Sequence, residues 1–154
     1  MSGKSFFVDL TKCTACRGCQ IACKQWNKLP AEETRNHGSH QNPMDVSAIT
    51  YKTVHMKEVA DDKGFMAAWL FFPEQCRHCT EPLCVEGCLT GAMHRDVVTE
   101  AVVCDEGRCV GCWTCVMVCP FGVIQRSVTG RKAASKCDLC YREDTPACVS
   151  HCPN

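Results

Sequence analysis

The residues of this chain best suited to chemistry are its cysteines, which number seventeen among 154 residues. Sixteen of them fall into four groups of four, called tetrads 1 to 4 here. Tetrads 1 and 3 have the spacing C-x2-C-x2-C-x3-C, in which three thiolates bind one [4Fe–4S] cluster and the fourth binds another. The tetrads therefore predict four clusters, and clusters in series carry electrons. In chain order the tetrads are Cys13, Cys16, Cys19 and Cys23; Cys76, Cys79, Cys84 and Cys88; Cys109, Cys112, Cys115 and Cys119; and Cys137, Cys140, Cys148 and Cys152.

Disulfides and structural zinc are the other common uses of dense cysteine. Cysteines spaced closely in one loop make poor disulfide partners, because a disulfide needs separated Cβ atoms that face each other. A structural zinc site draws two ligands from each of two knuckles, whereas tetrads 1 and 3 place three cysteines in one loop. Tetrads 2 and 4 read C-x2-C-x4-C-x3-C and C-x2-C-x7-C-x3-C, with every ligand position still cysteine. These spacings favour iron–sulfur clusters over both alternatives.

Other reactive residues give weaker signals. When Phe6–Cys13 is aligned with Val102–Cys109, Cys104 takes the place of Val8, so we expect a small buried apolar residue rather than a redox-active thiol. His78 and His151 lie inside tetrads, where donation to a cluster sulfur is the expected role rather than ligation. No nucleotide-binding loop, catalytic triad or paired acid cluster occurs, so the sequence predicts a chain without an active site of its own.

Charge and hydropathy exclude two classes of partner. The 17 basic and 17 acidic side chains balance, but four clusters with their thiolates would add a charge of roughly −8. We therefore expect the lysines and arginines to offset cluster charge, and their scattered positions argue against nucleic-acid binding. No apolar run approaches the roughly 18 residues that span a bilayer, which predicts a soluble chain without direct membrane insertion.

The elements that position the tetrads repeat along the chain. The alignment of Phe6–Cys13 with Val102–Cys109 predicts a duplicated unit of strand, ligand loop, short helix and strand. We expect helices at 20–28 and 116–119. Hairpins are expected at 92–104, with a turn near Thr99, and at 123–135, with a turn at Thr129 and Gly130. The predicted class is α+β, with duplicated ferredoxin-like iron–sulfur units, short strands and helices, and much irregular loop.

A stretch of 52 residues without cysteine separates Cys23 from Cys76. Its first part, 26–43, is polar and contains prolines, which predicts a long loop. Strands are expected at 49–56 and 65–72, joined by a turn at 61–64. Long irregular loops in compact domains are usually functional, so we interpret this loop as a docking arm for a partner, with a solvated linker as the alternative.

With these residues described, the chain resembles the four-cluster ferredoxin-like subunits of molybdenum and tungsten pterin oxidoreductases, above all the β subunit of formate dehydrogenases. Similar subunits serve tungsten aldehyde oxidoreductases, so the resemblance specifies the type of subunit better than the enzyme. It covers essentially the whole chain. It is carried by FFVDLTKCTACRGCQIACKQWNKLPAEETRN (Phe6 to Asn36), LFFPEQCRHC (Leu70 to Cys79) and SKCDLC (Ser135 to Cys140).

The resemblance implies that the tetrads cross-pair, each sending its last cysteine to the cluster of another tetrad. It also implies one domain, 1–154, made of two interlocked halves (1–30 with 125–154, and 70–124) and an inserted arm and hairpin, 24–72. The implied ligand sets are set A, Cys13, Cys16, Cys19 and Cys152; set B, Cys137, Cys140, Cys148 and Cys23; set C, Cys76, Cys79, Cys84 and Cys119; and set D, Cys109, Cys112, Cys115 and Cys88.

The resemblance further implies a non-catalytic subunit. Electrons would pass from a molybdenum or tungsten pterin subunit that oxidises formate or an aldehyde to a flavin subunit or a ferredoxin. A free polyferredoxin that shuttles between enzymes is the alternative, and the docking arm argues against it. Head-to-tail self-association into a filament is a further hypothesis.

The ends of the sequence suggest a location. Relatives generally continue past the last Cys-Pro, and many add a membrane anchor, whereas this sequence ends at Asn154. The first residues contain neither an apolar leader nor a twin-arginine pair. These features predict a compact cytoplasmic protein.

Overall fold

The computed structural model describes residues 3, 5–33, 35–128, 130 and 132–154. Its regular elements are short and are separated by irregular loops that carry the cysteines. In chain order they are α1 (Gly18–Trp26), β1 (Thr53–Ala60), β2 (Met66–Glu74), α2 (Leu83–Glu86), β3 (Met93–Arg95), β4 (Val102–Cys104), α3 (Thr114–Val118), β5 (Gln125–Arg126), β6 (Ala134–Ser135) and α4 (Ala147–Ser150).

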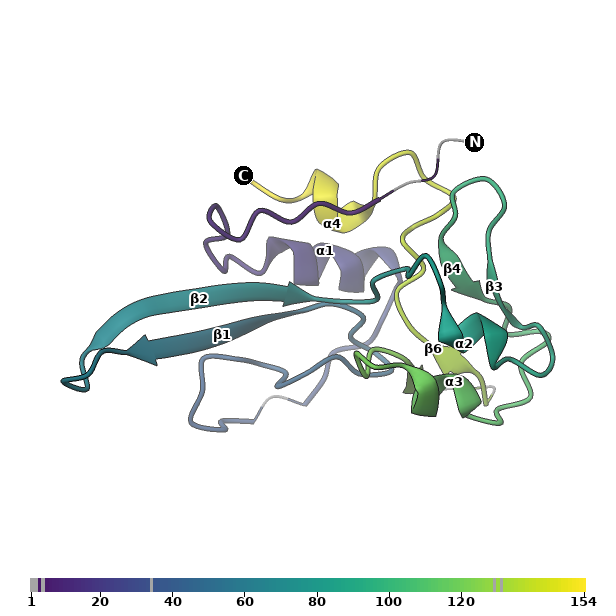
Figure 1. The fold of residues 1–154 in the computed structure, drawn as a ribbon, viewed down its shortest axis with the longest axis horizontal. Coiled ribbons are helices and arrows are strands. Elements are labelled where there is room, and N and C mark those ends of the chain that lie inside the picture. Colours follow the sequence, from purple (N-terminus) through teal and green to yellow (C-terminus); the bar gives the residue numbers. More distant parts are fainter. Residues whose placement is uncertain (1–2, 4, 34, 129, 131) are drawn as a thin grey trace.

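The helices pack in two pairs, one at each end of the body of the molecule. α1 contacts α4, and α2 contacts α3 (Figure 1). The first pair joins segments near the two ends of the sequence, and the N-terminal segment runs alongside it (Figure 1). The α1–α4 pair brings together tetrads 1 and 4, which are distant in sequence. The α2–α3 pair brings together tetrads 2 and 3, which are separated by the β3–β4 hairpin.

The strands form three antiparallel pairs, β1 with β2, β3 with β4, and β5 with β6. The β1–β2 hairpin is the longest and projects away from the helices (Figure 1). Its turn is closed by Asp61, whose Oδ1 accepts the N–H groups of Lys63 and Phe65 at 2.9 Å each. Gly64 follows with a φ of 82°, a conformation that glycine adopts without steric cost.

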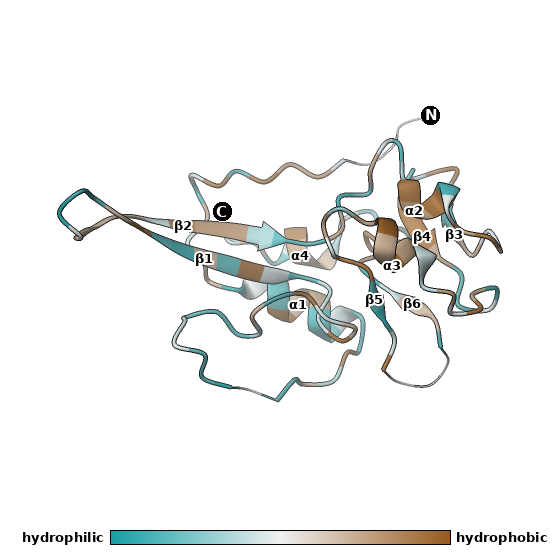
Figure 2. Cartoon of the chain, turned by 60° about the horizontal axis from the view of Figure 1, so that its bottom comes forward, coloured by the Kyte–Doolittle hydropathy of each residue, from teal (hydrophilic) through white to brown (hydrophobic). Residues whose placement is uncertain are grey.

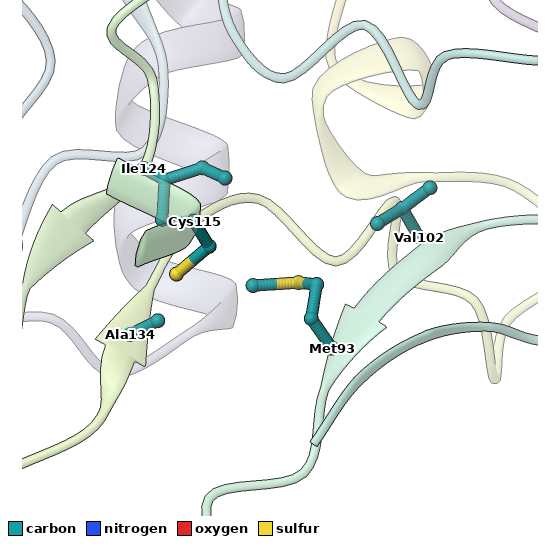
Figure 3. Close-up of a cluster of buried hydrophobic side chains, with 5 residues drawn as sticks. All are labelled: Met93, Val102, Cys115, Ile124 and Ala134. Atoms are coloured by element: carbon teal, nitrogen blue, oxygen red, sulfur yellow. The ribbon is translucent and has the colours of Figure 1, made fainter. Parts of the chain in front are cut away.

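The hydrophobic core is small and includes sulfur. One cluster consists of Met93, Val102, Cys115, Ile124 and Ala134, which come from β3, β4, α3, the segment before β5, and β6 (Figure 3). A second consists of Val46, Cys76, Val123 and Cys137. Because cysteines of tetrads 2, 3 and 4 belong to these clusters, the core and the tetrads occupy the same space.

The predicted α+β class with short elements and much loop is confirmed. The helices begin two residues earlier than expected, at Gly18 and Thr114, and the 92–104 and 123–135 hairpins form, although Thr129 lies outside the described residues. No helix in the described part of the chain has the length and apolar character needed to cross a membrane.

Two strand predictions were wrong. The segment from Phe6 to Leu10 was expected to form a strand, as does β4, with which it aligns in sequence. β4 pairs with β3, but no described strand pairs with the N-terminal segment, so its described residues form no strand. The first strand of the long hairpin begins at Thr53 rather than at residue 49. Residues 47–50 instead form a tight turn, in which Lys24 Nζ donates to Ile49 O and to Thr50 Oγ1 at 2.8 Å each.

Candidate functional site

The four tetrads share one backbone feature. In each of them the residue just before the second cysteine has a positive φ: 54° for Ala15, 47° for His78, 69° for Gly111 and 64° for Leu139. Three of the four are not glycine, and an L-residue in this conformation costs roughly 1–2 kcal/mol. Such strain is typical of functional sites. Here it turns the loop so that backbone N–H groups face sulfur, as where Leu139 N donates to Cys137 Sγ at 3.3 Å.

Tetrads 1 and 3 are built alike, as their sequence alignment predicts. Asp9 Oδ1 accepts Thr11 N at 2.9 Å, and Asp105 Oδ1 accepts Gly107 N at 2.8 Å. Arg17 and Trp113, which follow the second cysteines, both have positive φ and both precede a helix. The duplicated unit thus extends from the turn before the first ligand to the helix that carries the fourth.

Tetrads 2 and 4 form a second kind of unit. Each places its third cysteine, Cys84 or Cys148, as the second residue of a four-residue helix that follows a proline, Pro82 or Pro146. Proline before a helix lacks only an N–H that would have no partner inside the helix. Each helix pair therefore combines one unit of each kind: α1 of tetrad 1 with α4 of tetrad 4, and α3 of tetrad 3 with α2 of tetrad 2.

Cysteines from different tetrads line common cavities. All of set C lines one cavity of about 60 Å³, and all of set B lines another of about 10 Å³. All of set A lines a cavity of about 330 Å³, together with Cys148 of set B. For set D, Cys88 and Cys109 pack against the core cluster that contains Cys115.

In sets A, B and C the four cysteines line a cavity. Among the described residues, no three histidine, cysteine or acidic side chains converge tightly enough to hold a single metal ion. Thiolates are the ligands that iron–sulfur clusters use, so the donor set of each cavity fits such a cluster chemically.

Neighbouring sets contact one another in a single order. Cys148 of set B lines the cavity of set A. Cys76 of set C and Cys137 of set B share one core cluster. Cys84 of set C packs against the core cluster that contains Cys115 of set D. These contacts give the order A–B–C–D.

Burial dominates the electrostatics of the tetrads. Desolvation raises the pKa of Cys23 to about 12 and that of Cys84 to about 11, and it raises the pKa of Cys137 as well. Cys88 differs: burial acts upward, but its pKa is lowered by hydrogen bonds, including one from Met93 N at 3.2 Å. A buried thiol releases its proton when iron binds, so loading of most ligands is coupled to proton release.

Two buried lysines and one half-buried histidine lie close to the tetrads, and sequence reasoning did not single out the lysines. Lys52 is 3% exposed and Lys136 is 6% exposed. His78 accepts Val102 N through Nδ1 at 3.0 Å, while its Nε2 is buried and has no hydrogen-bond partner among the described residues. Desolvation, reinforced by Lys136 and Arg95, lowers the pKa of His78 to about 3, so the ring is neutral. The position of Lys136 directly before Cys137 was the available sequence signal.

Cys104 lies on β4, partly buried against the first core cluster. Burial, and then the neighbouring Cys109, raise the pKa of Cys104 to about 12. A thiol with so high a pKa is neutral at physiological pH and is a weak nucleophile. This environment agrees with the predicted apolar role.

Comparisons with known proteins bear on the same residues. Residues 12–92 and residues 67–154 each match a family model described as a 4Fe-4S dicluster domain. The chain is 41% identical to formate dehydrogenase 2 subunit beta (cytochrome c-553) of Nitratidesulfovibrio vulgaris and 42% identical to formate dehydrogenase subunit beta of Megalodesulfovibrio gigas. Each alignment covers 97% of this chain and 73% of the relative. The formate dehydrogenase-O iron-sulfur subunit of Escherichia coli is 30% identical, over 95% of this chain and 49% of the relative.

Proposed function

Because this protein belongs to the 4Fe-4S dicluster family and is an iron–sulfur subunit of the formate dehydrogenase β type, we propose that it carries electrons singly through four [4Fe–4S] clusters. The donor would be a molybdenum or tungsten pterin catalytic subunit, of the formate dehydrogenase or aldehyde oxidoreductase type. The acceptor would be a flavin subunit or a ferredoxin. The chain is itself an electron-transfer subunit and not the catalytic one.

The proposed ligands are the four sets A to D. The observation that carries this proposal is that cysteines from two different tetrads line one cavity in sets A, B and C. The bound clusters would supply one-electron oxidation and reduction, while the chain supplies thiolates and N–H donors to the sulfurs. We also propose two interlocked halves, 1–30 with 125–154 and 70–124, plus the inserted segment 24–72. The α1–α4 and α2–α3 contacts support this division.

The order A–B–C–D is the proposed path of the electron. It is supported by the three contacts between neighbouring sets, of which Cys76 with Cys137 is the one between the halves. Sets A and D are thus the ends of the path. Both ends open outward, since Cys16 and Cys152 in set A and Cys112 in set D are exposed.

The inserted segment supports assembly with a larger partner. Near the end of the loop 26–43, Gln41 is held against β1, where its Oε1 accepts Met56 N at 3.0 Å. The adjacent hairpin exposes large apolar side chains, among them Met66 at 64% and Leu70 at 56%. Exposed apolar surface of this kind marks interaction sites. A cytoplasmic location and head-to-tail self-association stay predictions, and the particle sizes in electron micrographs of the purified complex test the second.

Metal analysis tests the ligand assignment. The chain purified without oxygen is expected to contain about sixteen iron atoms, four for each cluster. Cys148→Ala removes a ligand of set B and is expected to lower the iron content by about four atoms or more per chain. Cys104→Ala is the matched control, and it should retain the full content because Cys104 belongs to no set.

Other outcomes would contradict the proposal. Zinc in stoichiometric amount without broad visible absorption would show a structural zinc protein. Equal loss of iron in both cysteine variants would remove the distinction between ligand and non-ligand cysteines. Purification of the native protein without any pterin-containing subunit would favour a free polyferredoxin.

A further inference from the structure

Lys52 and Lys136 are the only charged side chains that are buried among the described residues. Lysine is almost never fully buried unless its charge is paired, because removing an ammonium group from water is costly. Within the described part of the chain neither lysine forms an ion pair with a carboxylate. Their positive charges therefore call for another source of compensation.

The bonding partners of both ammonium groups are neutral. Lys52 Nζ donates to Gln75 Oε1 and lies 5.1 Å from the centroid of the Phe6 ring. Lys136 Nζ donates to Cys137 O at 2.7 Å and to Val102 O. These contacts fix the position of each charge without cancelling it.

Each lysine lies at a junction between two ligand sets. Lys52 lines the cavity of set A together with Cys148 of set B, so it belongs to the A–B junction. Lys136 precedes Cys137 of set B and is bonded to Val102, which lines the cavity of set C, so it belongs to the B–C junction. The C–D junction has no buried cation among the described residues.

We propose that Lys52 and Lys136 are positioning charges that raise the reduction potentials of the clusters bound at sets A, B and C, with set B affected by both. This inference rests on the proposed function. It adds that the uneven placement of the lysines makes the reduction potentials of the four clusters unequal. Reduction adds one negative charge to a cluster, and a nearby positive charge in a medium of low dielectric constant stabilises that added charge. Each electron leaves one cluster as it enters the next, and the step requires no proton.

Acidic groups act in the opposite direction at one place. Asp138 and Glu143 both raise the pKa of Cys140 in set B, after burial. Asp138 also acts on Cys23, where Lys52 opposes it. Glu143 is exposed and Asp138 is half-buried, whereas both lysines are buried, so solvent screens the charges of the acids more strongly than those of the lysines.

The test measures midpoint potentials of the full chain loaded with iron, by reduction with dithionite followed by electron paramagnetic resonance. Lys52→Met and Lys136→Met remove one charge each while keeping a side chain of similar length. Each is expected to weaken electron binding at the neighbouring clusters about tenfold, which corresponds to a fall of about 59 mV for a one-electron couple. Lys63→Met, in the exposed hairpin turn, is the control and should leave every potential unchanged.

Two further variants separate charge from packing. Lys52→Arg retains the charge and should restore the potentials toward their original values. Gln75→Glu places a carboxylate beside the intact Lys52 and should lower the same potentials as Lys52→Met. If Lys136→Met fails to bind iron, these variants and Lys52→Met still decide the question.

Iron content separates this inference from the proposed function. If Lys52→Met and Gln75→Glu keep the full iron content and show unchanged potentials, the role of the lysines is overturned. The proposed electron transfer through four clusters would then still stand. An original chain without about sixteen iron atoms would overturn the proposed function itself.

Discussion

At the scale of single residues, the tetrads depend on a backbone conformation that most residues avoid. The residue before the second cysteine is left-handed in every tetrad, yet only Gly111 at this position is glycine. Gly111 also lies against neighbours, because a Cβ atom there would be 3.0 Å from Lys132 O and 3.3 Å from the Trp113 ring. The absence of a Cβ atom at Gly111 thus permits both the left-handed turn and the close packing of the loop.

Gly111→Ala should therefore destabilise the loaded chain more than the left-handed conformation alone explains. Gly122→Ala is the matched control, since Gly122 has a similar φ of 63° and nothing within 4 Å of the added Cβ. The control should cost roughly 1–2 kcal/mol, and Gly111→Ala should cost more. The apparent Tm of the two iron-loaded variants measures the difference, and equal values would show that the close contact with Lys132 is relieved without cost.

Sequence reasoning succeeded for these residues where spacing carried the information. The alignment of Asp9 with Asp105 predicted a duplicated unit, and in the structure both aspartates accept a backbone N–H two residues further on. The same alignment could not reveal that Lys52 and Lys136 are buried, because a lysine reads as exposed unless its surroundings are known. Those surroundings come from segments distant in sequence, Gln75 for Lys52 and Val102 for Lys136.

At the scale of elements, the β1–β2 hairpin stands apart from the body of the molecule. Much of β2 is apolar (Figure 2), and its outer part is exposed on both faces. The predicted boundaries of this hairpin were off at β1, because alternation at Ile49 and Tyr51 resembles a strand. Lys24 and Glu32 hold that segment in a turn instead, through contacts that periodicity cannot show.

The hairpin is expected to contact the catalytic subunit. Leu70→Lys should reduce the amount of pterin-containing subunit that co-purifies, because a charge would be buried at the interface, while the iron content stays unchanged. Val98→Lys, on the exposed loop between β3 and β4, is the control, since Val98 is 71% exposed. Equal co-purification in both variants would place the interface elsewhere.

At the scale of the whole molecule, clusters rather than hydrocarbon would fill the interior. The longest helix in the described part of the chain has nine residues, and the two core clusters described above include cysteine sulfur. Isolated helices of this length are marginal in water, so we expect the α1–α4 and α2–α3 pairs to depend on the proposed clusters that would join them. We expect the fold to depend on iron, as small metal-binding domains do.

Removal of iron should therefore unfold the chain. Treatment with a chelator and reductant is expected to abolish most of the helical circular dichroism and to expose Trp26, Trp69 and Trp113 further to solvent, seen as a red shift of fluorescence. Reconstitution with iron and sulfide should restore both signals. A chain that keeps its native spectrum without iron would show that the protein alone specifies the fold.

The packing of α1 against α4 also affects how the chain is made on the ribosome. With the proposed ligands, sets C and D are complete once Cys119 has been synthesised, whereas sets A and B wait for Cys152 and Cys148. The N-terminal cysteines would thus be translated first and ligated last. Until then they would need protection from oxygen and from binding the wrong metal. A ribosome that stopped before Cys148 would release a chain in which only sets C and D could bind clusters.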